Sequence, residues 1–85
     1  MTYQVFFQPS ADRAFRKLPA NVQRRLDPVI LSLAIEPHPA SGLKLSGMEN
    51  LWRIRVGDYR IIYQVQDKNL RVLVVAIGHR KEIYR

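Results

Sequence analysis

The chain of 85 residues contains no cysteine and no long apolar run. Without cysteine, neither a disulfide framework nor a zinc site built from thiolates is possible. No apolar run approaches the roughly 18–20 residues that cross a membrane, and Met1 leads straight into YQVFF rather than into a basic region and a cleavage site. These absences predict a cytoplasmic protein without membrane contact. Walker, GxGxxG and Ser-His-Asp signatures are absent too, so we expect no cofactor.

Acidic residues are scarce. Seven Asp and Glu stand against fourteen Lys and Arg, which gives a net charge of +7. The excess is concentrated in residues 51–85, with eight basic and three acidic residues, whereas residues 1–50 hold six and four. Such a balance favours a polyanionic partner, either nucleic acid or an acidic protein. The alternative explanation is that the charge serves solubility alone.

The stretch LWRIRVGDYRIIY, residues 51–63, is predicted to form a β-hairpin around Gly57-Asp58. Glycine suits the first central position of such a turn, where the backbone needs a positive φ. Pairing outward from the turn sets Arg55 against Arg60, and alternation puts Arg53 on their face of the sheet. The other face is predicted to be core and holds Trp52, Ile54, Val56, Tyr59, Ile61 and Tyr63.

The cross-strand pair of like charges, Arg55 and Arg60, is the feature that points to function. Like charges directly opposite each other destabilise a sheet by a few tenths to about 1 kcal/mol. A chain tolerates this cost more readily where an anion occupies the space between the charges. The alternative is that arginines on edge strands only prevent aggregation.

Residues 3–8 read as a strand, and two helices follow. The first is capped by Ser10 and ends at Pro19; the second runs from about Ala20 to Ile35, with a bend expected at Pro28. Residues 36–50 are rich in proline, glycine and serine and predict a surface connection. Strands at 51–56, 59–66 and 69–77 complete the chain, with a second bend at Asp67-Lys68.

These elements predict a single α+β domain over residues 1–85 in the order β-α-α-β-β-β. We expect a two-layer sandwich in which both helices pack on one face of a mainly antiparallel four-stranded sheet. Counting outward from the second bend puts Tyr63 beside Val72 without a slip of the core face. Ile61 then lies beside Val74, and Tyr59 beside Ala76. The other face stays open.

The end of the chain, IGHRKEIYR, brings further polar side chains close to the open face. If Gly78 lets the backbone turn, Arg80 and Tyr84 can swing toward the arginines, although a frayed basic tail fits the spacing equally well. His79 keeps the parity of Val75 and is expected on the same face. His38 lies between two prolines and is interpreted as a solvated loop residue. Two distant histidines predict no metal site.

Taken together, these motifs resemble the RelE/ParE superfamily of bacterial and archaeal toxins from toxin–antitoxin pairs. The resemblance covers nearly the whole chain: the opening strand, FRKLP at 15–19, the second helix, LKLSGMENLWRIRVGDYRIIYQV at 43–65 and GHRKEIYR at 78–85. Within the superfamily the chain looks closest to RelE-like, ribosome-dependent mRNA interferases. That resemblance implies cleavage of messenger RNA in the ribosomal A site, without metal, by attack of a ribose 2′-hydroxyl on the adjacent phosphate.

The resemblance also implies roles for individual residues. The family's catalytic positions match Arg53, Arg55, Arg60, Arg80 and Tyr84. Family members of the best-known type carry lysine at the first two positions, and arginine is a poor proton acceptor. Tyr84 is therefore expected to stack on a base first and to move a proton second, with His79 as the other titratable candidate. Further contacts to RNA or the ribosome are expected from Lys44, Arg71, Lys81 and Arg85.

The partners implied are a RelB-like antitoxin, the ribosome with its message and, through the antitoxin, operator DNA. Two alternatives remain open at this stage. A ParE-like inhibitor of DNA gyrase would share the scaffold without needing the arginine cluster, and a plain nucleic-acid-binding module would need only the basic patch.

Overall fold

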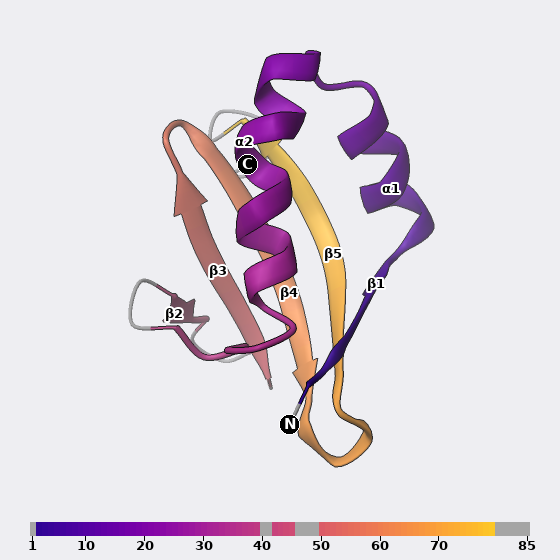
Figure 1. The fold of residues 1–85 in the computed structure, drawn as a ribbon, viewed down its shortest axis with the longest axis vertical. Helices are drawn as coiled ribbons and strands as arrows, with labels where there is room; N and C mark the ends of the chain where they lie inside the picture. Colours follow the sequence, from indigo (N-terminus) through magenta and orange to yellow (C-terminus); the bar gives the residue numbers. More distant parts are fainter. Residues whose placement is uncertain (1, 40–41, 46–49, 80–85) are drawn as a thin grey trace.

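The computed structural model describes residues 2–39, 42–45 and 50–79. The elements are β1 (Gln4–Phe7), α1 (Pro9–Arg16), α2 (Ala20–Ser32), β2 (Leu43–Lys44), β3 (Leu51–Val56), β4 (Tyr59–Gln66), the 3-10 turn η1 (Asp67–Asn69) and β5 (Arg71–His79). The strands form one sheet in the order β1-β5-β4-β3-β2 (Figure 1). β1 pairs with β5 in parallel, and every other neighbouring pair is antiparallel. The predicted α+β class and element order are confirmed, and β2 is a short fifth strand within the predicted surface connection.

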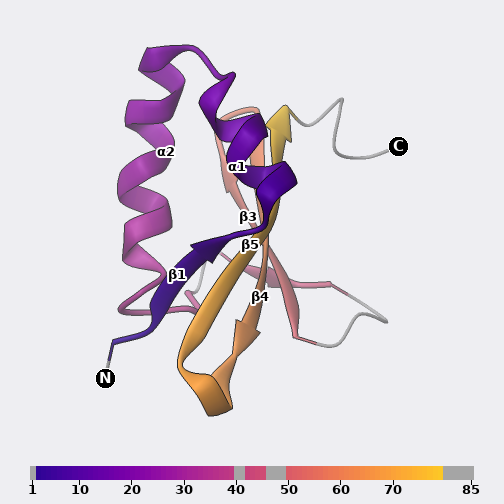
Figure 2. The same cartoon turned by 90° about the vertical axis from the view of Figure 1, so that its right-hand side faces the viewer.

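The hydrophobic core lies between the helices and one face of the sheet. Val22, Leu26 and Ile30 follow one another at helical spacing on α2 and are at most 6% exposed. The sheet contributes Ile54, Ile61, Tyr63, Val65, Val72, Val74 and Ile77. Seen from the side, α2 runs along one face of the sheet (Figure 2). No helix in the described part of the chain covers the opposite face of the sheet (Figure 2). None of the described helices is long and apolar enough to cross a membrane.

The helix ends differ from the prediction in three places, one of which is the end of α1 at Arg16 rather than at Pro19. Ser10 does not cap α1, because the helix begins at Pro9 with Gln8 in the N-cap position. Proline suits the first helical position, since its fixed φ is helical and its missing N–H would have no helical partner there. α2 ends at Ser32 rather than at Ile35, whose N–H donates to the Ser32 carbonyl in a closing turn.

Pro28 lies inside α2 without dividing it. An interior proline removes one hydrogen bond to the carbonyl four residues earlier, which here belongs to Arg24. Both residues are exposed, so water can reach that carbonyl. The helix therefore continues through Pro28 for another turn.

The β3–β4 hairpin has the predicted register. Arg55 pairs with Arg60, Arg53 with Ile62, and Trp52 with Tyr63. Gly57 has a φ of 62°, a backbone conformation that disfavours any residue with a Cβ. A Cβ at Gly57 would also collide with the guanidinium of Arg25, which reaches over the turn from α2. The positive φ of the turn therefore favours glycine, whereas the end of the flexible Arg25 side chain can move aside.

The β4–β5 pairing differs from the prediction, and the expected register is wrong. The connection is the turn η1 followed by Leu70 in a left-handed conformation, so Gln66 pairs with Arg71 and Tyr63 pairs with Val74 rather than with Val72. A register shift follows between Ile62 and Tyr63. A β-bulge of this kind leaves one residue, here Val75, without a partner and reverses the alternation beyond it.

Beyond the bulge, Ile61 pairs with Ile77 instead of Val74, and Tyr59 pairs with His79 instead of Ala76. Gly78 becomes the neighbour of Arg60. We predicted that the residues of the core face alternate regularly to the end of β5. This prediction is wrong for the residues beyond the bulge. The bulge restores Ile77 to the core, where it is 6% exposed.

We expect the substitution Gly57→Ala to destabilise the fold by about 1–2 kcal/mol, since alanine pays the full penalty of a left-handed φ. Displacement of the flexible Arg25 side chain should add little to this cost. Asp58→Ala, at the neighbouring exposed position, is the control and should change stability by less than about 0.5 kcal/mol. Urea denaturation followed by circular dichroism measures both. Equal effects of the two variants would contradict the assigned turn.

Candidate nucleic-acid interface

Three arginines share the face of the sheet that the helices leave uncovered. Arg53 and Arg55 lie two residues apart on β3, and Arg60 lies directly across from Arg55 on β4. Residues two apart on a strand point to the same face, and cross-strand partners do too. The prediction that these three side chains belong to one face of the sheet is confirmed, because Ile54 and Ile61, on the opposite face, are buried in the core.

Their exposure differs strongly. Arg55 is exposed, Arg53 is intermediate, and Arg60 is only 6% exposed, which makes it the one buried charged residue of the described chain. The guanidinium of arginine does not lose its proton in proteins, so Arg60 keeps a positive charge in a poorly solvated position. An ion pair or phosphate contact is stronger there than in bulk water, since the effective dielectric constant is lower.

Gly78, on the other side of Arg60, has no side chain to fill the adjacent position. Gly78 is itself buried, as Arg60 is. A planar guanidinium can grip two oxygens of a phosphate at once, and several around one phosphate can stabilise charge that develops on it. This arrangement suits an anion that approaches the sheet face.

The remaining predicted residues do not all join this cluster. Lys44 is exposed on β2 and pairs with Trp52, so it belongs to the helix-covered face. Arg71 lies on the arginine face but at its far end, opposite Gln66. Arg80, Lys81, Tyr84 and Arg85 lie outside the described residues.

The expectation that His79 faces the arginines is wrong. After the bulge, His79 pairs with Tyr59, and the two rings meet edge-on with centroids 5.6 Å apart. Tyr59 packs against the hydrophobic core and lines a cavity beside α1. His79 therefore belongs to the helix-covered face of the sheet.

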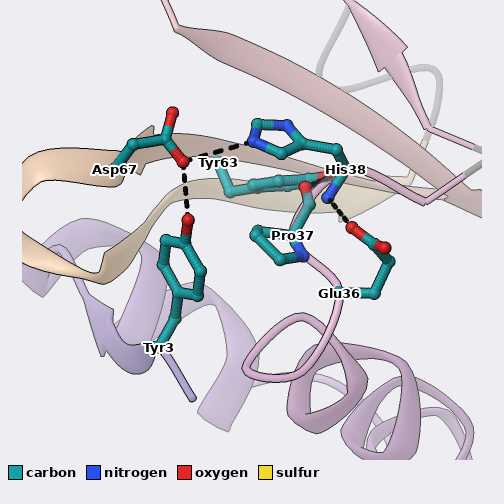
Figure 3. Close-up of polar contacts among 6 residues, drawn as sticks. All are labelled: Tyr3, Glu36, Pro37, His38, Tyr63 and Asp67. Carbon is teal, nitrogen blue, oxygen red and sulfur yellow. Dashed lines mark hydrogen bonds and ion pairs between the residues drawn. The ribbon is translucent and has the colours of Figure 1, made fainter. Parts of the chain in front are cut away.

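A second polar cluster lies at the far end of the sheet from the β3–β4 turn and ties three distant segments together (Figure 3). The hydroxyl of Tyr3 donates to Asp67 Oδ1 at 2.7 Å, and His38 Nε2 lies 3.4 Å from the same oxygen. The ring of His38 also contacts Trp52 at 4.7 Å between centroids. His38 is an exposed loop residue, as expected, and these two contacts also hold the connection between α2 and β2 against the sheet.

The contacts among Tyr3, His38 and Asp67 form a structural clasp, which holds segments together and is not a reactive centre. Its hydrogen bonds from Tyr3 and then from His38 lower the pKa of Asp67, and the bond to Asp67 raises the pKa of Tyr3. Both pKa shifts favour an ionised Asp67 that accepts a hydrogen bond from a protonated Tyr3. Among the described residues, no three His, Asp or Glu side chains gather as a metal site requires.

Tyr63 also contacts the connection between α2 and β2, from the core side of the sheet. Its side chain is fully buried, and its hydroxyl donates to the Pro37 carbonyl at 3.1 Å. Burial, and then the charge of Glu36, raise the pKa of Tyr63 to about 12. The connection leads into β2, which pairs with β3, so Tyr63 helps to position the strand that carries Arg53 and Arg55.

The raised pKa of Tyr63 predicts a loss of stability at alkaline pH. A group whose pKa is higher in the folded state stabilises the fold below its unfolded value near 10, and this contribution disappears as the pH rises toward about 12. Tyr63→Phe should cost about 1–3 kcal/mol near neutral pH, because the Pro37 carbonyl loses its partner. The stability gap between wild type and variant should then narrow above about pH 10. Urea midpoints across this range test it, and a constant gap would contradict the assignment.

The Arg55–Arg60 pair predicts a gain of stability when one charge is removed. Arg55→Thr should raise the free energy of unfolding by a few tenths to about 1 kcal/mol, because it removes a like-charge contact and threonine suits an exposed strand. Added salt should shrink the gain by screening the repulsion in the wild type. The matched control is Arg24→Thr on α2, for which no stabilisation is expected. Urea denaturation at low and high salt gives the comparison, and a gain independent of salt would count against repulsion.

The fold and the arginine face together define a class: a small basic α+β domain with three arginines on the helix-free face of its sheet. The model of the ParE toxin of type II toxin-antitoxin system, parDE, matches residues 5–84. The mRNA interferase toxin RelE of Escherichia coli (strain K12) is 31% identical over 88 residues, which cover 99% of this chain and 92% of that protein. The chain therefore belongs to the RelE/ParE superfamily of toxins of type II toxin–antitoxin systems.

Solved structures agree with this assignment. The isolated E. coli RelE toxin superposes with a TM-score of 0.82 at 29% identity, covering 91% of this chain and 83% of that one. The archaeal RelE in the RelE-RelB complex from Pyrococcus horikoshii gives a TM-score of 0.82 at 33% identity, covering 94% and 97%. The likeness extends over almost the entire chain.

Proposed function

We propose that this toxin is a ribosome-dependent endoribonuclease that cuts messenger RNA in the ribosomal A site. The observation that carries the proposal is the convergence of Arg53, Arg55 and Arg60 on the helix-free face of the sheet. A relative 31% identical over nearly the whole chain is an mRNA interferase, which supports the same reaction class. In this reaction the ribose 2′-hydroxyl attacks the adjacent phosphate, and the following nucleotide leaves.

The arginines would act on the charge of the transition state. Attack on the phosphate produces a pentacovalent, doubly charged species, and preorganised cations stabilise it more than they stabilise the ground state. Arg60 is suited to this role because it is buried and held between Arg55 and Gly78. Arg53 and Arg55 would orient the strand by gripping phosphate oxygens in bidentate fashion. The resemblance adds Arg80 to this set.

The proton of the 2′-hydroxyl needs an acceptor other than these arginines, which do not give up their own protons. His79 packs against Tyr59 on the other face of the sheet, so Tyr84 is the side chain that we propose for stacking and proton transfer, on the basis of the family resemblance. No metal is required for this step, since the attacking oxygen belongs to the substrate.

The partner that would neutralise the protein is a RelB-like antitoxin. RelE has been crystallised in complex with RelB from E. coli and from Pyrococcus horikoshii. A net charge of +7 suits an acidic partner that covers the arginine face or the helices. The complex would bind operator DNA through the antitoxin, and the free toxin would act on ribosomes in the cytoplasm.

A second candidate is inhibition of DNA gyrase without nuclease chemistry. The observation that favours it is the matching family model, which describes ParE toxins of parDE pairs. A protein that only binds gyrase has no need for a buried arginine beside a glycine on an open sheet face. The arginine face therefore favours the nuclease.

Cell-free translation tests the proposal. Adding the protein should stop translation and produce cuts within ribosome-bound message, and Arg60→Ala should lower the cleavage rate at least about ten-fold, or about 1.4 kcal/mol of transition-state stabilisation. Arg55→Ala, at an exposed position that the fold does not need, should show a loss of the same kind. Primer extension on the message measures the cuts.

Arg24→Ala is the matched control, because it removes one exposed positive charge from α2, in the helical layer. It should leave the cleavage rate within about two-fold of the wild type. Intact message together with arrested supercoiling would favour the gyrase function. Equal losses of cleavage rate in Arg24→Ala and Arg55→Ala would mean that the arginines act only through general electrostatic attraction.

A further inference from the structure

The far end of the arginine face carries an exposed aromatic side chain. Phe6 on β1 is 44% exposed and lies beside Leu73 on β5, its partner in the parallel pairing. Val5 and Phe7, its neighbours along β1, pack against the core, so Phe6 points to the opposite, helix-free face. A hollow of about 300 Å³ opens there, lined by Phe6, Gln66, Arg71 and Leu73.

The hollow combines the groups that recognise an unpaired nucleobase. The guanidinium carbon of Arg71 lies 5.6 Å from the centre of the Phe6 ring, within the range of a cation–π contact. Unstacked bases bind on aromatic rings and on the planes of arginine guanidinium groups, and amides beside them hydrogen-bond to base edges. Gln66 supplies such an amide, which donates to Gln64 at 2.9 Å on the same face.

The charge of the face favours nucleic acid as the occupant. Arg53, Arg55, Arg60 and Arg71 occupy strand positions on it, and no carboxylate occupies any described strand position of this face. Gln66 and Arg60 lie on the same strand, six residues apart, which corresponds to about 20 Å. A single strand held at the arginine cluster can therefore run along the sheet and reach the hollow.

We propose that Phe6 and Arg71 form a stacking platform for one unpaired base of the messenger RNA, several nucleotides away from the bond that is cut. This proposal rests on the proposed function for the direction of the strand along the sheet. The platform adds affinity and sets the register of the message, and it tolerates any base because every base has a flat face. A less specific role, the shielding of an edge strand by arginine, would need no base at all.

Equilibrium binding of a labelled single-stranded RNA at low salt, followed by fluorescence anisotropy, tests the platform without requiring cleavage. Phe6→Ala should weaken binding about ten-fold, and Phe6→Trp should restore it, because stacking on one aromatic residue contributes on this order. The matched control is Leu31→Ala, which truncates a side chain that is 62% exposed on α2. It should leave the affinity unchanged. Circular dichroism establishes that each variant is folded.

A series of strands, each with one abasic nucleotide, locates the stacked base. One position should weaken wild-type binding about as much as Phe6→Ala does and should have no further effect on that variant. Fully paired RNA should bind wild type and Phe6→Ala equally, since its bases are already stacked.

Three results would overturn the platform: unchanged RNA affinity in folded Phe6→Ala, an equal loss on paired RNA, or weakened antitoxin binding with RNA binding intact. The last would make the hollow a protein-docking site. Failure of the nuclease function would give a different result. The wild-type protein would leave ribosome-bound message intact, while one abasic position would still weaken RNA binding. Cleavage that depends on Arg55, with no effect of Phe6→Ala on RNA binding, would remove the platform alone.

Discussion

The register of the β3–β4 hairpin is the constraint on which the rest of the structure depends. Gly57 accepts the positive φ of the turn, and the turn decides which residues of the two strands face each other. Since successive side chains point to opposite faces, a slip by one residue would move the arginines into the core and the core residues into water. Burial of Ile54 and Ile61 in the core therefore keeps the three arginines on the helix-free face of the sheet.

The same arrangement sets stability against function. Concentrating positive charge on one face of a sheet is unfavourable, most of all where Arg55 and Arg60 are direct neighbours. The core on the other face and the clasp around Tyr3, His38 and Asp67 hold the strands in place despite this repulsion. In the proposed function, a bound polyanion would relieve this repulsion, and the free energy withheld from folding would contribute to binding.

The bulge in β5 shapes the arginine face as much as the hairpin does. By reversing the alternation after Val75, it keeps Ile77 in the core and places Gly78 beside Arg60. Without the bulge, a side chain larger than hydrogen would stand next to the buried guanidinium. The bulge also turns His79 toward Tyr59 and away from the face that carries the arginines.

What the sequence by itself determined are features that follow from short-range rules, although the exact helix ends were not among them. The Gly57-Asp58 turn, the face shared by Arg53, Arg55 and Arg60, and the order of helices and strands depend on φ preferences and on periodicity, which are legible within a dozen residues. Only the tertiary structure decided the β4–β5 register, because a 3-10 turn ending in left-handed Leu70 and a bulge have no strong local signature. It also brought together groups far apart in the chain, such as Phe6 with Arg71 and His38 with Asp67, since such contacts depend on how layers pack rather than on what stands next in the sequence.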